Sequence, residues 1–274
     1  MYQVGLSSCG FSLTEDNFKR LAESGIAAIE ISMPSDQYAQ INYQEILEFS
    51  KRYQVGLWSY HLPFSPFRVI DISSPSKEIR EHSVELYTEL IGKATDIGID
   101  KFIVHPSGEP IEESARAERM KHSIETLDRL AEIAHRHGAI VAVEDLPRSC
   151  LGRTAAEIRE LISANDKLRV CFDTNHLLVD TNLNFMTQLS DKIVTVHVSD
   201  YDFVDEKHWL PGEGSVDWSE LLATLRAINY RGPFLYEISL KPLKTLPRSH
   251  DLTFADFARN ADEIFTGKPL TRIC

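Results

Sequence analysis

The sequence is short of cysteine, of basic charge and of long apolar runs. Its four cysteines, Cys9, Cys150, Cys171 and Cys274, are scattered among 274 residues, with no C-x-x-C pair. This spacing provides neither a zinc knuckle nor a disulfide framework, so we expect reduced thiols. Cys171 lies inside an apolar run, which is typical of a core residue rather than of a nucleophile.

Basic residues are outnumbered by acidic ones. Lysine and arginine total 29 against 41 aspartates and glutamates, which gives a formal net charge of -12 at pH 7. No block of lysine or arginine stands out as a footprint for a phosphate backbone. The charge balance therefore argues against a nucleic-acid partner, although an acidic chain can still carry a local basic patch.

No uninterrupted apolar stretch approaches the roughly 20 residues that a membrane span requires. The opening residues, MYQVGLSSCGF, also lack a basic segment followed by a long apolar one. We therefore expect no membrane partner and a cytoplasmic location. A Pro-, Gly- or Ser-rich linker is absent as well, so residues 1–274 are predicted to form a single domain.

Short apolar runs alternate with longer amphipathic stretches along the whole chain. The runs span 2–6, 26–32, 55–61, 101–105, 139–144, 168–173, 192–198 and 233–238. Apolar residues three or four apart predict helices over 13–24, 43–53, 77–97, 112–137, 154–164, 216–229 and 254–265. Segment 182–190 is short and poorly periodic. Buried strands separated by helices indicate an α/β protein with a parallel sheet, and eight such units favour a closed (β/α)8 TIM barrel.

Most of these apolar runs end on a side chain that can bind a metal. The six terminal residues are His61, His105, Glu144, Asp173, His197 and Glu237. Carboxyl ends of the strands in such a barrel converge on one mouth, and alternate strand residues share a face. The terminal polar groups are therefore expected to point into the mouth together.

Each of these residues alone has an ordinary structural explanation. Asp173 could cap a helix, His105 could be a hydrogen-bonded core histidine, and Glu237 could pair with a surface lysine. Together, several ionisable groups in one half-buried place repel or lose solvation unless a cation or a substrate satisfies them. Carboxylates with some imidazole, and no thiolate, suit Mn²⁺, Mg²⁺, Co²⁺ or Zn²⁺.

Several motifs at these strand ends resemble the xylose isomerase-like barrel superfamily. They are VHPSG (104–108), VEDLPR (143–148), FDTNH (172–176), VHVSD (196–200), HWLPGEGSVDW (208–218) and YEI (236–238). The superfamily includes sugar and sugar-phosphate isomerases, ketose 3-epimerases, inosose dehydratases and endonuclease IV. The resemblance extends over nearly the whole chain.

The resemblance to ketose 3-epimerases implies one divalent metal ion, which we expect to be Mn²⁺ ahead of Mg²⁺, Co²⁺ or Zn²⁺. Its ligands would be Glu144, Asp173, His197 and Glu237. Glu144 and Glu237 would also be catalytic, one removing a proton next to a carbonyl and the other returning it on the opposite face, through an enediolate held on the metal. The substrate would be a small carbohydrate: a sugar, a sugar phosphate or a related polyol.

Further residues are expected to contact this substrate. His176 is implied by the resemblance, and Arg148 could hold a hydroxyl, carboxylate or phosphate. The remaining substrate-binding candidates are His61, His105, His208 and Trp58, of which Trp58 could equally be a core residue. Phe64 and Phe67 could wall the pocket.

Four more polar or aromatic positions each have two possible interpretations. Glu30 points either to the mouth or to a salt bridge, and Asp200 either orients His197 or is solvated. Relatives often form dimers, and Trp209 and Trp218 would meet either a partner subunit or the adjoining loops.

Other functions remain open. Endonuclease IV, which cleaves abasic DNA with three zinc ions, has further ligands that match His61, His105, His176 and His208, with Glu206 where that pattern has aspartate. A dehydratase acting on a keto-polyol would share the first proton abstraction. A sugar-binding or regulatory protein would keep the scaffold without turnover.

Overall fold

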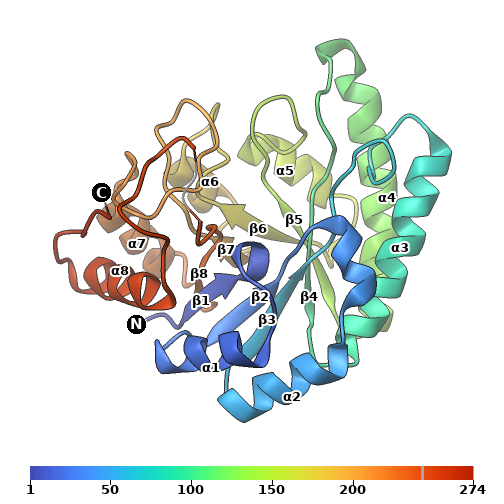
Figure 1. Ribbon diagram of the computed structural model, residues 1–274. Helices are drawn as coiled ribbons and strands as arrows, with labels where there is room; N and C mark the ends of the chain where they lie inside the picture. The colour runs from blue at the N-terminus through green and yellow to red at the C-terminus, as the bar shows by residue number, and fades with distance from the viewer. Residues whose placement is uncertain (242–243, 274) are drawn as a thin grey trace.

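The computed structural model describes residues 1–241 and 244–273, so Cys274 lies outside the described part. Strands and helices alternate along the chain (Figure 1). The strands are β1 (Val4–Ser7), β2 (Ala28–Ile31), β3 (Gly56–His61), β4 (Lys101–Val104), β5 (Ile140–Glu144), β6 (Arg169–Asp173), β7 (Ile193–His197) and β8 (Phe234–Tyr236). The α-helices are α1 (Glu15–Glu23), α2 (Tyr43–Tyr53), α3 (Lys77–Thr95), α4 (Arg116–Arg136), α5 (Ala155–Ile162), α6 (Asn182–Gln188), α7 (Trp218–Ala227) and α8 (Phe254–Thr266).

The strands form one parallel sheet that curls into a barrel. Consecutive strands pair from β1 to β7, and β1 also pairs with β8. A short parallel bridge closes the ring between β7 and β8, where Val198 N donates to Leu235 O at 2.8 Å and Glu237 N donates to Val198 O at 3.2 Å. The helices surround the strands (Figure 1), which confirms the predicted single-domain (β/α)8 barrel.

The apolar core lies mainly between the strands and the helices. Strand residues such as Phe102 and Val143 are fully buried there. A second, smaller apolar group consists of Ile103, Ala142 and Cys171 on neighbouring strands. Burial raises the pKa of the Cys171 thiol well above its ordinary value, which supports the predicted core role.

Local sequence signals fix the ends of the helices. Side chains that accept a hydrogen bond from the first turn of a helix are those of Thr14, Asn42, Ser76, Thr154, Thr181 and Asp217. Gly98 and Gly138 follow α3 and α4 with φ of 90° and 72°, a left-handed conformation that ends helices. The poorly periodic segment 182–190 contains helix α6, capped by Thr181. Within the described ranges, no helix is long and apolar enough to cross a membrane.

Candidate metal centre

The polar strand ends meet at one end of the barrel. His61, Glu144, Asp173 and His197 are the last residues of β3, β5, β6 and β7. Strands β4 and β8 end slightly earlier than expected, so His105 and Glu237 are the first residues after them. This small shift leaves both side chains at the same level of the barrel, because their nitrogen and carboxylate atoms still lie among those of the other strand ends.

Glu144, Asp173, His197 and Glu237 form a central group, which we call the quartet. Each offers a ligand atom, and these atoms all lie within 4.8 Å of one another. His197 Nδ1 is 2.8 Å from Glu144 Oε1, 3.4 Å from Glu237 Oε2 and 3.9 Å from Asp173 Oδ2. Asp173 is fully buried, and its Oδ2 has no hydrogen-bond partner among the described residues. A buried carboxylate oxygen without a partner is costly, so this donor set fits a divalent cation.

Glu30 of β2 is fully buried and holds the other nitrogen of His197. His197 Nε2 donates to Glu30 Oε2 at 3.0 Å, and Ser59 Oγ donates to the same oxygen at 2.8 Å. Because Glu30 holds the Nε2 proton in place, a metal ion that displaced the proton of Nδ1 would meet the Nδ1 lone pair facing the quartet. Sequence reasoning left the direction of Glu30 open and did not link it to His197. The sequence feature that could have pointed to this role of Glu30 is its position near the end of the second apolar run, 26–32.

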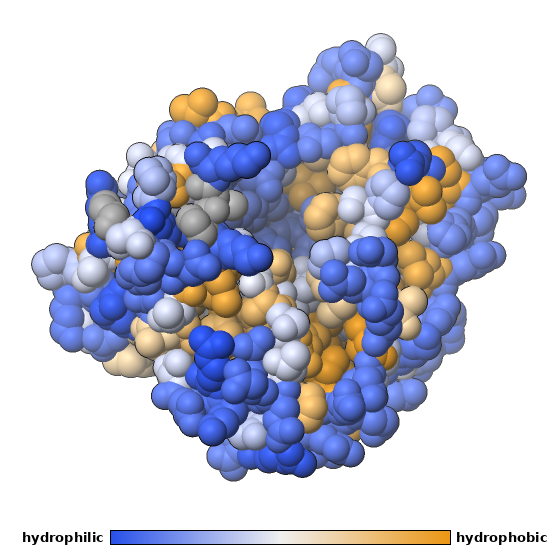
Figure 2. Space-filling view, in the orientation of Figure 1, coloured by the Kyte–Doolittle hydropathy of each residue, from blue (hydrophilic) through white to orange (hydrophobic). Residues whose placement is uncertain are grey.

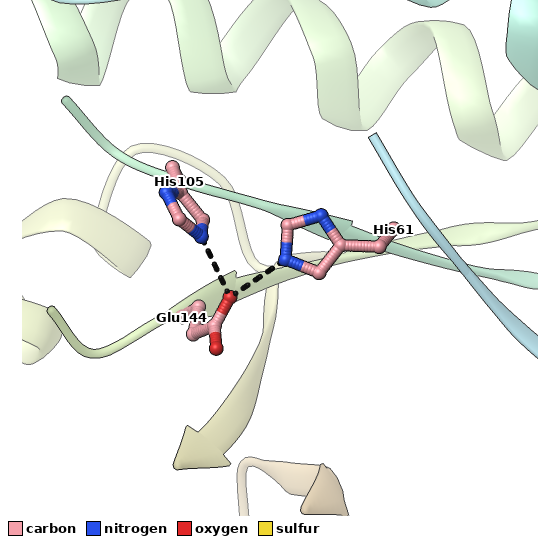
Figure 3. Close-up of side chains that lie close together, drawn as sticks. All are labelled: His61, His105 and Glu144. Carbon is pink, nitrogen blue, oxygen red and sulfur yellow. Dashed lines mark hydrogen bonds and ion pairs between the residues drawn. The ribbon is translucent and has the colours of Figure 1, made fainter. Parts of the chain in front are cut away.

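A second group lies at the other oxygen of Glu144 (Figure 3). His61 Nε2 and His105 Nε2 are each 3.1 Å from Glu144 Oε2. His197 Nδ1 instead contacts the other oxygen, Glu144 Oε1. Burial alone would lower the pKa of His61, but the hydrogen bond and charge of Glu144 outweigh it and raise the pKa to about 9. Burial lowers the pKa of His105. Glu144 therefore presents one oxygen to each of two ligand groups.

A third group consists of His176, Glu206 and His208. Glu206 Oε1 is 2.8 Å from His208 Nε2 and 3.7 Å from His176 Nε2. The Nδ1 atoms of the two histidines donate to backbone oxygens, from His208 to Glu237 at 3.0 Å and from His176 to Asp145 at 2.8 Å. Burial would lower the pKa of His208, but the bond to Glu206 raises it to about 9. This group and the second one also place their ligand atoms close enough for an ion.

A cavity lies beside these groups. Its wall includes His105, His176, His208 and Glu237, together with Phe64 and Phe67. Glu237 is the one quartet member in this wall, since the other three side chains are fully buried. Burial and the nearby charge of Glu144 raise the pKa of Glu237. The face drawn in Figure 2 is hollowed near its middle, and both hydrophilic and hydrophobic residues border the hollow.

Arg148 lines the same cavity but is bound to three carboxylates. Its Nε and Nη2 donate to both oxygens of Glu109 at 3.0 and 2.6 Å, and its Nη1 donates to Glu206 at 2.8 Å and to Asp205 at 3.2 Å. Glu109 follows β4 and the other two acids follow β7, so the guanidinium ties three mouth loops together. Arg148 and His208 have φ of 53° and 50°, left-handed backbone that a side chain with a Cβ seldom adopts.

Trp58 is not brought to the cavity. Its Nε1 donates to Thr195 Oγ1 at 3.1 Å, and Lys101 Nζ lies 4.0 Å from the centre of the ring. Thr195 precedes His197 by two positions and Lys101 begins β4, so Trp58 lies toward the amino-terminal end of the barrel, away from the mouth. A register shift between β2 and β3 leaves Trp58 as an extra residue, and this displaces it from the predicted position.

Asp200 neither orients His197 nor is solvated. It is fully buried and accepts four hydrogen bonds, from Tyr201 N, Gly212 N, Val216 N and Trp218 Nε1, at 2.8 to 3.1 Å. Trp218 is buried as well and so does not face a partner subunit. Both readings of Asp200 were therefore wrong, because this aspartate organises the loop after β7 instead. Trp218 contacts that adjoining loop, which was one of its two expected surroundings.

A family model described as xylose isomerase-like TIM barrel matches residues 18–253 of the chain. An uncharacterized protein of Methanocaldococcus jannaschii is 29% identical over 243 residues, covering 84% of this chain and 81% of that protein. A probable endonuclease 4 of Acholeplasma laidlawii is 28% identical over 156 residues, 51% of each chain. The crystal structure of a D-tagatose 3-epimerase-like protein superimposes with a TM-score of 0.80 and 25% identity, over 97% of this chain and 96% of that one.

Proposed function

The chain belongs to the xylose isomerase-like TIM barrel family, and from this premise we propose that it is a divalent-metal-dependent isomerase or epimerase of a sugar, a sugar phosphate or a related polyol. The observation that carries the proposal is the convergence of the quartet around the unpartnered oxygen of Asp173. The likeness to a D-tagatose 3-epimerase-like protein supports the same class of reaction.

In this proposal Glu144, Asp173, His197 and Glu237 hold the ion, and Mn²⁺ is the ion that we favour. When bound, a divalent ion stabilises the negative charge that develops on a substrate oxygen as the neighbouring carbon loses its proton. Without such stabilisation, a carboxylate with a pKa of about 4.3 is too weak a base for this proton.

Glu144 and Glu237 are the proposed proton-transfer groups, and their surroundings shift their pKa values in opposite directions. Burial and the charge of Glu144 raise the pKa of Glu237, which makes this carboxylate a better base. The Glu237 side chain also lines the cavity directly. Burial would raise the pKa of Glu144 too, but His197, His105 and His61 outweigh it and lower that pKa. Two carboxyls with diverging pKa values are typical of acid and base pairs.

The substitutions Glu144→Gln and Glu237→Gln test these roles. With a ketose substrate and saturating Mn²⁺, each is expected to lower kcat by a factor of about 100 to 10,000, the usual worth of a positioned acid or base. Metal content, measured by elemental analysis, should stay high, and deuterium uptake from D2O into the sugar should fall with kcat. Glu85→Gln, on an exposed face of α3, is the matched control.

Full activity in both variants would refute the assignment. Net loss of water from the substrate, rather than inversion at carbon, would identify a keto-polyol dehydratase. A sugar that raises the melting temperature but yields no product would identify a binding protein.

A second candidate function is a zinc phosphodiesterase that acts on abasic DNA. It is favoured by the division of Glu144 between two histidine groups, since Oε2 faces His61 and His105 while Oε1 faces His197. With ions bound, Glu144 would be able to serve as a ligand in both of these groups. The partial match to a probable endonuclease 4 points the same way. The net charge of -12 opposes it.

Metal analysis separates the two candidates. About one ion per chain after dialysis against Mn²⁺ or Zn²⁺ supports the isomerase, and about three zinc ions per chain support the nuclease. An abasic-site DNA duplex and a free ketose, tested with the same preparation, provide the corresponding activity readouts.

A further inference from the structure

The positive charge around the cavity is already neutralised. Among the described residues that line it, Arg148 is the one arginine or lysine. All three guanidinium nitrogens of Arg148 donate to carboxylates, at 2.6 to 3.2 Å. The pairing with Glu109 is bidentate, which is the geometry that an arginine would otherwise use for a substrate carboxylate or phosphate.

The histidines of the wall are also occupied. His208 donates through Nδ1 to the backbone oxygen of Glu237, and its Nε2 faces Glu206. His176 donates through Nδ1 to Asp145 O, and its Nε2 lies 3.7 Å from Glu206. These rings thus compensate Glu206. The third histidine of the wall, His105, has its Nε2 3.1 Å from Glu144 Oε2, so no side-chain cation of the described wall is left over for a second anion.

Carboxylates outnumber the arginine in this wall. Glu109, Glu206 and Glu237 line the cavity beside Arg148. The nearby Lys207 is not in the wall, and its Nζ lies 3.7 Å from Asp202. A phosphate group carrying close to two negative charges would therefore lose its hydration in the cavity without gaining a free side-chain cation as a partner.

Resting on the proposed function, we propose that this cavity accepts an uncharged keto-sugar and excludes its phosphate ester, and that Arg148 holds the mouth loops together instead of binding a substrate anion. The hydroxyl groups of a neutral sugar can bond to the acceptor-rich wall formed by Glu109, Glu206 and Glu237. The aromatic side chains of Phe64 and Phe67 provide the apolar wall that a sugar site usually has.

Matched pairs of substrates test this inference. L-Ribulose is compared with L-ribulose 5-phosphate, and D-fructose with D-fructose 6-phosphate, on the Mn²⁺-loaded full chain. We expect kcat/KM for at least one free sugar to exceed that for its ester by about 100-fold or more, since an anion buried without a paired cation is strongly disfavoured. Titration with inorganic phosphate should give no competitive inhibition of the free sugar.

The outcomes are distinguishable from failure of the proposed function. Equal or better turnover of an ester overturns the charge inference while the isomerase assignment stands. If neither member of any pair is turned over or shifts the melting temperature, the proposed function fails and this inference fails with it.

Two variants test the part assigned to Arg148. Glu109→Gln removes one carboxylate from Arg148, so that a charge-assisted contact with Arg148 becomes available to the ester. We expect the ratio of kcat/KM for the free sugar to kcat/KM for the ester to fall roughly tenfold. Arg148→Gln should lower kcat/KM for the free sugar, because the mouth loops lose their link. The ratio of kcat/KM for the free sugar to kcat/KM for the ester should not increase. Selective loss of ester turnover in Arg148→Gln would instead show that Arg148 binds the anion.

Discussion

Glu30 and His197 show how one buried residue can set the chemistry of another. Glu30 accepts a hydrogen bond from Nε2 of His197, and Nδ1 is the ring nitrogen that faces the quartet. Removal of such a carboxylate partner usually weakens metal binding by about 10- to 100-fold. We therefore predict that Glu30→Ala raises the Kd for Mn²⁺ by that factor, measured by titration with detection of free Mn²⁺ by electron paramagnetic resonance.

The conservative variant Glu30→Gln serves as the control for a packing defect. Its amide oxygen can still accept the proton of Nε2, so it should restore most of the Mn²⁺ affinity, and ¹⁵N shifts of His197 in the Zn²⁺-loaded protein should still indicate a proton on Nε2. Unchanged Mn²⁺ affinity in Glu30→Ala would contradict this role.

Single residues were the hardest features to place from the sequence. The inward direction of His61, Glu144, Asp173 and His197 follows from the two-residue period of strands, because each ends its strand. Trp58 breaks that period, since the register shift between β2 and β3 inserts one residue. A bulge depends on contacts between strands, and these leave no mark on the local sequence pattern.

At the level of elements, the loop between β7 and α7 depends on Asp200. Its Oδ1 accepts from Tyr201 N and Val216 N, and its Oδ2 accepts from Gly212 N and Trp218 Nε1. Asp200→Asn would turn an amino group toward two of these donors. We predict a loss of about 2 to 4 kcal/mol in the free energy of unfolding, because two buried donors lose their acceptor, measured by urea denaturation.

Amide hydrogen exchange locates this effect. The amides of Gly212 and Val216 should exchange faster in Asp200→Asn, while those of β5 should keep their protection. Asp166→Asn is the matched control, since that side chain is 93% exposed, and it should change stability by no more than about 0.5 kcal/mol. Equal stability of Asp200→Asn and the parent protein would show that the loop is held by other contacts.

Strands and helices could be predicted wherever buried apolar residues recur at a regular spacing along the sequence. Buried parallel strands are apolar on both faces, so all eight runs appear as strands close to their expected limits. Helices α2 and α8 follow their periodic segments for the same reason. Helix α6 has seven residues, too few for a period to be recognised, and its start depends on the Thr181 cap.

For the whole molecule, metal binding should contribute to stability. An ion that binds the folded chain at about 100 times its Kd adds about 2.7 kcal/mol, which corresponds to a rise of about 5 °C in Tm for a chain of this size. We predict such a rise on addition of Mn²⁺ and its reversal by EDTA, measured by differential scanning calorimetry. Asp173→Asn should abolish most of it.

The control for this measurement is Asp166→Asn, which should retain the full shift. A similar Mn²⁺ effect in Asp173→Asn and in the parent chain would place the stabilising ion outside the quartet. The barrel and its mouth could be inferred from the order of the strand ends, but which hydrogen bonds each ligand makes depends on side chains from distant strands, as Glu30 and Arg148 illustrate.

The closure between β7 and β8 also bears on how an ion would enter or leave. Val198 joins β7 to β8 through two hydrogen bonds, to Leu235 O and from Glu237 N, and His197 directly precedes Val198. Loss of these two hydrogen bonds would let His197 and Glu237 move apart without disturbing β5 or β6. We therefore expect the strength of this pairing to affect the rate at which an ion leaves the quartet.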